Sequence, residues 1–353
     1  FSLLSHGAMM PCGNLQFIKL LDVEDVASLL AHFAGRSSLR RFRASWRAAA
    51  DWAAEALRLL STKCSGSVYV CGGYCGPSKL RSAERFDILE GSWEKLPTML
   101  EVRSGPAAAS FEGDFYVFGT NSTTGKATAE RFVPSFGHWE ALPLMLQGRE
   151  RAASASVGGS LYVCGGLEKE TEIFALLRSM ERLRLDGQQN WEAQPMMSEP
   201  RDSPAAASLG RHLYICGGDG LQFQPLNTVE RFNVNEQTWE ALPPMFERRS
   251  GAAAAALDGQ IYVCGGSDGV RRLRSVERYN PRTASWHLVP AMLQQRFAPA
   301  AAAVAGKLYV CGGADDTGQL DSVECFDPSV NCWKEVPPMH APRMRAAAAA
   351  VSD

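Results

Sequence analysis

The sequence lacks an excess of charge of either sign. Its 353 residues include 36 basic and 38 acidic side chains, which leaves a net charge of −2 at pH 7. Because binding to a phosphate backbone requires a basic surface, this balance argues against a nucleic-acid partner. The chain also lacks an apolar run of the ~18 residues that a transmembrane helix needs, so no membrane partner is expected.

Catalytic signatures are missing as well. The histidines are scattered along the chain, and none falls into a Ser-His-Asp or Cys-His arrangement. No glycine-rich loop of the kind that cradles a phosphate is present. The sequence therefore predicts no catalytic residues, no metal site and no cofactor.

Half of the ten cysteines occupy one repeated position along the chain. They are Cys71, Cys164, Cys216, Cys264 and Cys311. Equivalent positions in successive repeats lie on separate sheets, too far apart for a disulfide, so these thiols are expected to pack as small hydrophobes. Cys71 and Cys75 have no histidine nearby and do not form a metal site. Reduced cysteines predict a cytoplasmic protein, with the nucleus as the alternative.

One stretch recurs down the chain, and residues 249–266 are its clearest copy. It contains an alanine run, an Asp258-Gly259 turn signal, an apolar strand and a Gly265-Gly266 break. Gly-Gly pairs also follow a strand at 72–73, 165–166, 217–218 and 312–313, and Phe118-Gly119 is a degenerate sixth copy. The recurrence predicts a repeat protein.

Each glycine pair is followed by a strand that centres on a glutamate, and then by one tryptophan. The tryptophans are Trp93, Trp139, Trp191, Trp239, Trp286 and Trp333. They are spaced 46 to 52 residues apart, and the longest interval comes from an insertion after Gly166. Four short strands in each unit, joined in sequence order, predict an antiparallel meander. A repeat length of about 50 residues with four strands is typical of a propeller blade.

The units resemble the kelch repeat. The resemblance is carried by the patterns Arg-x-x-Ala-Ala-Ala, Tyr-Val-Cys-Gly-Gly and Val-Glu-Arg-Tyr and by the single tryptophan, over about residues 66–353. A WD-type propeller would contain Trp-Asp pairs, and none occurs. The resemblance implies an all-β fold, a six-bladed kelch β-propeller, for residues 65–353.

The two ends of the repeat region complement each other. The alanine run from Ala346 to Ala350 has no following strand, whereas Val68 to Cys71 has no alanine run before it. We therefore expect the C-terminal strand to be the innermost strand of the first blade, which leaves no open edge. The alanine runs are expected at the crowded central axis, and the tryptophans are expected in the core between blades.

Residues 1–64 contain no repeat and predict a small N-terminal α-helical segment. Asp22 is the expected N-cap of a first helix, and the apolar residues of 23–33 fall at helical spacing. Residues 20–52 resemble an F-box in their length, their aliphatic first helix and their Arg-rich second helix. The usual Leu-Pro lead-in is replaced by Phe17-Ile18-Lys19. The tail of a BACK-type domain from a BTB–kelch protein and an unrelated packing cap are the alternatives.

Binding residues are expected on the face that carries the loops between second and third strands and the connections between blades. This face is rich in arginine, whose planar donors suit carboxylates and phosphates. The arginine that opens each repeat is expected to have a scaffold role, such as a hydrogen bond to a neighbouring blade. The candidate contact residues are Tyr74, Arg151, Phe223, Arg271, Arg272, Phe297 and Arg345.

The combined F-box and kelch resemblance implies a substrate receptor of a cullin-type ubiquitin ligase. Residues 15–60 would then bind the linker subunit of the ligase, and the propeller would bind an acidic or phosphorylated segment of another protein. A cytoskeletal or scaffolding interaction protein without a ubiquitin role is the first alternative. An oxidase-like propeller enzyme is the second, although the repeated tyrosines fall in mid-strand, as packing residues do.

Overall fold

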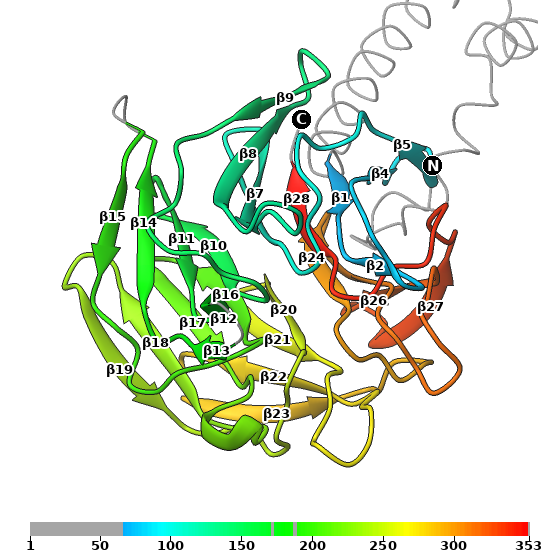
Figure 1. The fold of residues 1–353 in the computed structure, drawn as a ribbon. Coiled ribbons are helices and arrows are strands. Elements are labelled where there is room, and N and C mark those ends of the chain that lie inside the picture. Colours follow the sequence, from blue (N-terminus) through cyan, green and yellow to red (C-terminus); the bar gives the residue numbers. More distant parts are fainter. Residues whose placement is uncertain (1–65, 171–172, 186–188, 352–353) are drawn as a thin grey trace, which may run out of the picture. The chain divides into compact units, whose positions relative to one another are not determined.

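The computed structural model describes residues 66–170, 173–185 and 189–351. The described strands form six four-stranded antiparallel sheets, the blades, around a central axis (Figure 1). Each blade runs in chain order from its innermost to its outermost strand, except for the first. The predicted all-β six-bladed propeller is therefore confirmed, whereas the predicted N-terminal helical segment lies outside the described residues.

The blades have the following bounds. Blade 1 consists of β28 (Ala347–Val351), β1 (Ser67–Cys71), β4 (Ala83–Asp87) and β5 (Ser92–Lys95). Blade 2 consists of β6 (Ala107–Phe111), β7 (Asp114–Thr120), β8 (Ala127–Val133) and β9 (His138–Ala141). Blade 3 consists of β10 (Ala153–Val157), β11 (Ser160–Cys164), β14 (Met180–Arg184) and β15 (Trp191–Gln194).

Blade 4 consists of β16 (Ala205–Leu209), β17 (His212–Cys216), β18 (Val229–Asn233) and β19 (Thr238–Leu242). Blade 5 consists of β20 (Ala253–Leu257), β21 (Gln260–Cys264), β22 (Val276–Asn280) and β23 (Ser285–Val289). Blade 6 consists of β24 (Ala300–Val304), β25 (Lys307–Cys311), β26 (Val323–Asp327) and β27 (Cys332–Val336).

Three further elements lie in the loops between second and third strands. Blade 1 carries the hairpin of β2 (Tyr74–Cys75) and β3 (Ser78–Lys79), and blade 3 carries that of β12 (Leu167–Glu170) and β13 (Ile173–Leu176). The insertion after Gly166 thus forms a hairpin of its own. Blade 4 carries one 3₁₀ turn, Leu221–Phe223. In the described part of the chain, no helix is long and apolar enough to cross a membrane.

The C-terminal strand completes the first blade. Strand β28 pairs antiparallel with β1, from Cys71 opposite Ala347 to Ser67 opposite Val351. Figure 1 shows β28, in red, beside β1, in blue. The predicted closure is confirmed, with the strand beginning one residue later than expected. Every blade consequently has four strands, and the inner edge of β1 is paired with β28.

The innermost strands leave a narrow channel along the axis. Its lining consists of alanine and serine side chains only, and it encloses about 290 Å³. Alternate alanines of the same strands are buried between blades, as in the pattern of Ala253–Leu257. Small side chains are therefore needed on both sides of these strands, because larger ones would fill the channel or separate the blades.

The repeated tryptophans link each blade to the one before it. The indole Nε1 of each donates a hydrogen bond of 2.8 to 3.0 Å to a proline carbonyl in the preceding unit. The bond from Trp93 to Pro337 joins the first blade to the last. Trp139, Trp191, Trp286 and Trp333 are buried as predicted, while Trp93 and Trp239 are partly exposed.

The five repeated cysteines are buried and unpaired, as predicted. Burial raises the pKa of each thiol to about 12. Thiols with so high a pKa are inert as nucleophiles and as metal ligands, because both reactions need the thiolate. Their contribution is therefore to the packing of the second strands.

Candidate functional site

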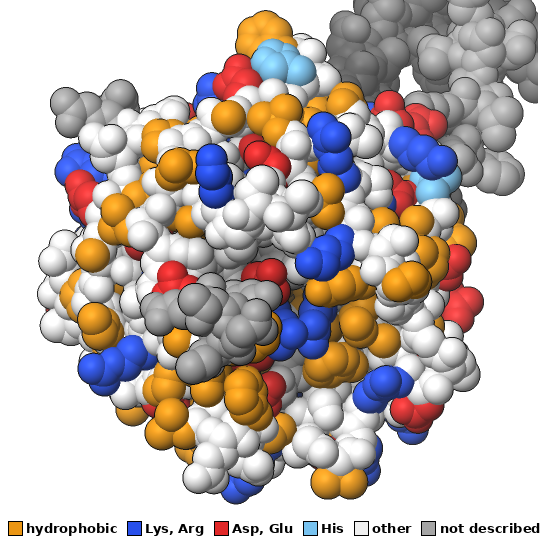
Figure 2. Space-filling model, in the orientation of Figure 1, with side chains coloured by type: hydrophobic (Ala, Val, Ile, Leu, Met, Phe, Trp, Pro, Cys, Tyr) orange, Lys and Arg blue, Asp and Glu red, His pale blue; other side chains and the backbone are white. Residues whose placement is uncertain are grey.

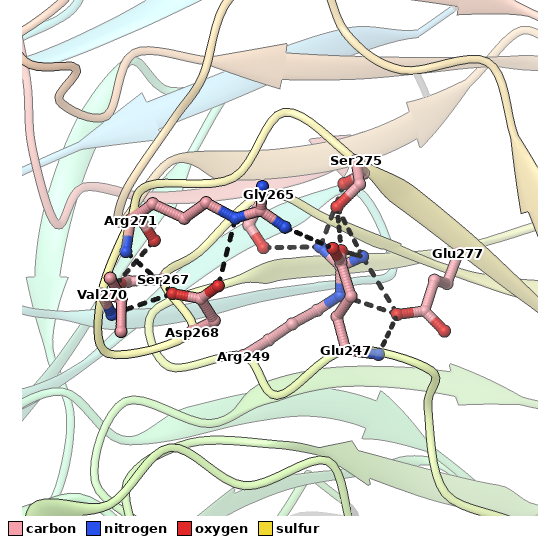
Figure 3. A network of polar contacts seen from close by, with 9 residues as sticks. All are labelled: Glu247, Arg249, Gly265, Ser267, Asp268, Val270, Arg271, Ser275 and Glu277. Atoms are coloured by element: carbon pink, nitrogen blue, oxygen red, sulfur yellow. Dashed lines mark hydrogen bonds and ion pairs between the residues drawn. The ribbon is translucent and has the colours of Figure 1, made fainter.

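The arginine that opens each repeat is buried in the scaffold. Arg249 has no exposed surface, and its guanidinium donates to Glu277 at 3.0 Å and to the Gly265 carbonyl at 2.9 Å (Figure 3). Ser275 and Glu247 accept further bonds from it. The same pairing with a buried glutamate of the third strand occurs in all six blades. The pairs are Arg103–Glu130, Arg149–Glu181, Arg201–Glu230, Arg249–Glu277, Arg296–Glu324 and Arg343–Glu84.

Each of these arginines also contacts the preceding blade, through its main-chain carbonyl. The Arg296 carbonyl accepts a 2.8 Å bond from the N–H of Gly266. A Cβ on Gly265 would lie 2.5 Å from the same oxygen, and Gly265 has a φ of +65°, so glycine is required there. The expected scaffold role is confirmed. The side chain bonds within the blade that it enters, however, and only the carbonyl reaches the neighbouring blade.

The residues two positions after these arginines surround one end of the axis. They are Gly105, Arg151, Ser203, Gly251, Ala298 and Arg345. With the residue that follows each, they line a cavity of about 120 Å³, which we call the axial mouth. Figure 2 shows this face, with basic side chains near its middle and hydrophobic side chains gathered to their right.

Main-chain hydrogen bonds connect these six residues almost completely into a ring. The N–H groups of Arg151, Ser203, Gly251, Ala298 and Arg345 each donate to the carbonyl of the preceding member, at 2.8 to 3.1 Å. The sixth bond, from Gly105 to Arg345, is not formed among the described residues. The five donors have φ between +51° and +58°, whereas Gly105 does not adopt a positive φ. The ring is thus open next to Arg345.

Arg151 is neutralised by the blade that follows it. Its Nη1 donates a 3.0 Å hydrogen bond to Oδ2 of Asp202, whose side chain is 2% exposed. Ser203 donates a second bond to the same carboxylate. The guanidinium of Arg151 is therefore held in an internal ion pair and is a poor candidate for binding an external anion.

Arg345 occupies the equivalent position in blade 1 and has no such partner. Among the described residues its side chain forms no hydrogen bond and no ion pair, and its Nε is buried. The blade that follows offers Ser104 at the position of Asp202. Burial, and then repulsion from Arg151, lowers the pKa of Arg345. The charges of Asp202 and Glu150 act on Arg345 in the opposite sense, but neither carboxylate pairs with it directly. A partly buried guanidinium without a directly paired carboxylate is a site where an anion would be stabilised.

Two groups of side chains, the acidic arc and the apolar arc, lie beside the residues that line the mouth. The acidic arc, in blades 3 and 4, comprises Glu150, Asp202 and Asp219. Asp202 and Asp219 face each other in an isolated bridge. Burial raises the pKa of Asp219, and the charge of Asp202 raises it further, although the hydrogen bond from Ser250 acts to lower it. This arc carries more negative charge than Arg151 alone neutralises.

The apolar arc, in blades 6 and 1, comprises Phe297, Met344 and Tyr74. Tyr74 and Met344 exchange two main-chain hydrogen bonds, at 2.9 and 3.1 Å, which places them beside Arg345. A Cβ on Gly251 would lie 2.8 Å from the ring of Phe297, so this ring covers a residue that lines the mouth. All three side chains are partly exposed.

Of the seven predicted contact residues, Arg151 and Arg345 line the mouth, and Tyr74 and Phe297 lie beside residues that line it. The other three lie in loops that do not line this cavity. Phe223 is 53% exposed in the 3₁₀ turn of blade 4. Arg271 and Arg272 line a separate hollow of about 330 Å³. They form ion pairs with acidic side chains at 3.2 to 3.5 Å. Their roles as contacts stay predictions.

The sequence interpretation missed the residues that distinguish Arg345 from Arg151. These are Asp202, Asp219, Glu150, Met344 and Ser104. A signal was present, because each follows either a repeated arginine or a glycine pair directly. Aligning the units on those two landmarks would have shown that the residue after each landmark differs in nearly every blade.

In residues 66–170, 173–185 and 189–351, no group of three or more His, Cys, Asp or Glu side chains is placed to hold a metal ion. The repeated tyrosines Tyr69, Tyr162, Tyr214 and Tyr262 are buried in their strands. Neither observation supplies the tyrosine and histidine ligands that the oxidase-like alternative needs.

Comparison with known families agrees with this architecture. The Kelch-repeats domain described as KLHDC2/KLHL20/DRC7 matches residues 151–353, more than half of the chain, and the Kelch motif matches residues 61–100. The chain therefore belongs to the Kelch-repeat family, whose propellers generally bind other proteins. Neither match covers residues 101–150, where the structure nonetheless has a complete blade. A search of curated proteins found no match.

Proposed function

We propose that this propeller binds a segment of another protein at its axial mouth, and that Arg345 holds a carboxylate or phosphate of that segment. The observation that carries the proposal is the partly buried Arg345 guanidinium, which forms no hydrogen bond or ion pair among the described residues. Arginine binds such groups through two parallel N–H donors. The rigid ring also presents its loops in one arrangement, which reduces the entropy lost on binding.

The test is selection of binding peptides from a random displayed library, with the full chain as bait. Selected peptides should share an acidic or phosphorylated residue, and Arg345→Ser should weaken their binding by about tenfold or more, the loss of roughly one charged hydrogen bond. Arg282→Ser, an exposed arginine in the turn between β22 and β23, is the matched control and should bind as the wild type does. Selected peptides without an acidic group, or equal binding by Arg345→Ser, would overturn the proposal.

We further propose that the chain is a substrate receptor of a cullin-type ubiquitin ligase in the cytoplasm or nucleus. Support comes from the F-box resemblance of residues 20–52 together with the protein-binding character of kelch propellers. The full chain should capture the linker subunit of the ligase, and a Leu29→Asp, Leu30→Asp variant in the predicted first helix should not. Phe136→Asp, at a 76% exposed site on the propeller, is the control and should retain capture.

The alternative is a cytoskeletal or scaffolding interaction protein without a role in ubiquitin transfer. It shares the binding mouth with the first proposal and differs only in the N-terminal segment. Absence of linker-subunit binding by the full chain, together with intact peptide binding by the propeller, would favour it.

A further inference from the structure

The surroundings of Arg345 differ from those of a simple anion site. On one side lie the three side chains of the apolar arc, and on the other lie the carboxylates of the acidic arc. The ligand group that Arg345 attracts is therefore enclosed by apolar surface on one side and by negative charge on the other. This asymmetry constrains what can stand next to the acidic group.

The apolar arc offers hydrophobic surface within reach of the bound group. Phe297 lies against Gly251 of the mouth, and Tyr74 and Met344 are joined to each other directly before Arg345. Burying a neighbouring leucine or aromatic side chain on this surface would remove apolar area from water on both partners, which is favourable. It would also exclude water from around the Arg345 ion pair, and the pair is stronger in a drier environment.

The acidic arc acts in the opposite sense. Arg151 neutralises Asp202, but Glu150 and Asp219 form no ion pair with a basic side chain among the described residues. Asp219 accepts only the hydroxyl of Ser250, a neutral group. A second acidic residue of the ligand would approach these carboxylates, which have no directly paired cation, and like charges brought together out of bulk water repel strongly.

We infer that the segment bound at the mouth carries a single acidic group with an apolar side chain directly beside it. The apolar side chain lies on Phe297, Met344 and Tyr74, and a run of acidic residues is rejected by Glu150 and Asp219. This inference rests on the proposed function and specifies the partner of the same site. By this inference the mouth differs from a site that binds any run of acidic residues.

The experiment compares four capped, fluorescein-labelled nonapeptides in a Gly/Ser background by fluorescence anisotropy with the full chain. Their central residues are Leu-Glu-Leu, Ser-Glu-Ser, Glu-Glu-Glu and Leu-Gln-Leu. We expect Leu-Glu-Leu to bind about tenfold more tightly than Ser-Glu-Ser, with Glu-Glu-Glu no tighter than Ser-Glu-Ser. Phe297→Ser should remove the preference for leucine and leave Ser-Glu-Ser binding unchanged. Phe136→Ser, an exposed aromatic in the turn between β8 and β9, is the matched control and should preserve the preference.

The outcomes separate the two proposals. Equal binding of Leu-Glu-Leu and Ser-Glu-Ser, with both lost in Arg345→Ser, would overturn the inference and leave the proposed anion site intact. Tightest binding by Glu-Glu-Glu would overturn it too, because the acidic arc would then not reject charge. Equal binding of the Glu and Gln peptides would overturn the proposed function itself.

Discussion

Arg343 and Arg345 lie two residues apart in one connection, yet they belong to different regions of the molecule. Arg343 is in the buried arginine layer, bonded to Glu84 and to two main-chain carbonyls, as its five equivalents are. Arg345 is at the axial mouth, where equivalents in other blades are glycine, serine, alanine or a neutralised arginine. The comparison teaches that repetition marks the scaffold in this chain, and that deviation from the repeat marks the candidate site.

Removing β28 should have the largest effect, because both regions depend on closure of the ring. Deletion of residues 347–351 leaves both arginines in the chain but exposes the inner edge of β1. We expect the cooperative unfolding transition to be lost. Tryptophan fluorescence measured against urea concentration tests this. A sigmoidal transition at the wild-type midpoint would show that the C-terminal strand does not support the buried layer.

The next effect distinguishes the two regions directly. Arg249→Ala leaves the buried Glu277 without a counter-charge and should lower the free energy of unfolding by about 3–5 kcal/mol. Arg345→Ala removes no hydrogen bond or ion pair and should change it by less than about 1 kcal/mol. Urea denaturation of both variants measures the difference, and similar losses in the two would refute the division into scaffold and site.

A smaller effect should appear when the two arginines of the mouth are made alike. Asp202→Ser removes the ion-pair partner of Arg151. It places a serine in the blade after Arg151, as Ser104 stands in the blade after Arg345. We expect the affinity for a peptide with a single glutamate to rise several-fold, because a second guanidinium becomes available. Anisotropy titration measures this change. An unaltered affinity would show that Asp202 does not prevent Arg151 from binding an external anion.

The smallest effect tests variation within the buried layer. Burial raises the pKa of Glu84, but hydrogen bonds from Arg343 and His340 outweigh burial and hold that pKa below its ordinary value of 4.5. The stability that Glu84 contributes is therefore present above pH 4.5 and is lost as the pH falls through its lowered folded-state pKa. His340→Leu should move the acid unfolding midpoint upward by a few tenths of a pH unit. No displacement would show that the His340 imidazole does not contribute to lowering this pKa.

Much of the fold could be predicted because the same residue pattern, which reflects the packing of one blade, occurs six times. The alanine runs, the glycine pairs and the single tryptophans each predict one position in a blade, and all of them are found there. The complementary defects at Val68 and at Ala346 predicted the closing strand. Residues 1–65 offered one copy of a weaker pattern, and their F-box interpretation stays a prediction.

The candidate site could be predicted only in part. Arg151, Arg345, Phe297 and Tyr74 stand out in the sequence because they break the repeat. In the structure the two arginines line the mouth, and the two aromatic residues lie beside it. The sequence could not show that Asp202 neutralises Arg151, because these residues are neighbours only through the packing of blade 3 on blade 4. For the same reason it could not separate the mouth from the hollow that holds Arg271 and Arg272.

The order of strands, the closure of the ring and the scaffold role of the repeated arginines were determined by the sequence itself, since local patterns and their period contain that information. The tertiary structure alone decided which arginine of the mouth has no ion-pair partner among the described residues. That property depends on side chains contributed by adjacent blades, Asp202 beside Arg151 and Ser104 after Arg345. Charge compensation acts through space over a few ångströms, and the chain brings these residues together only when six separate sheets pack around one axis.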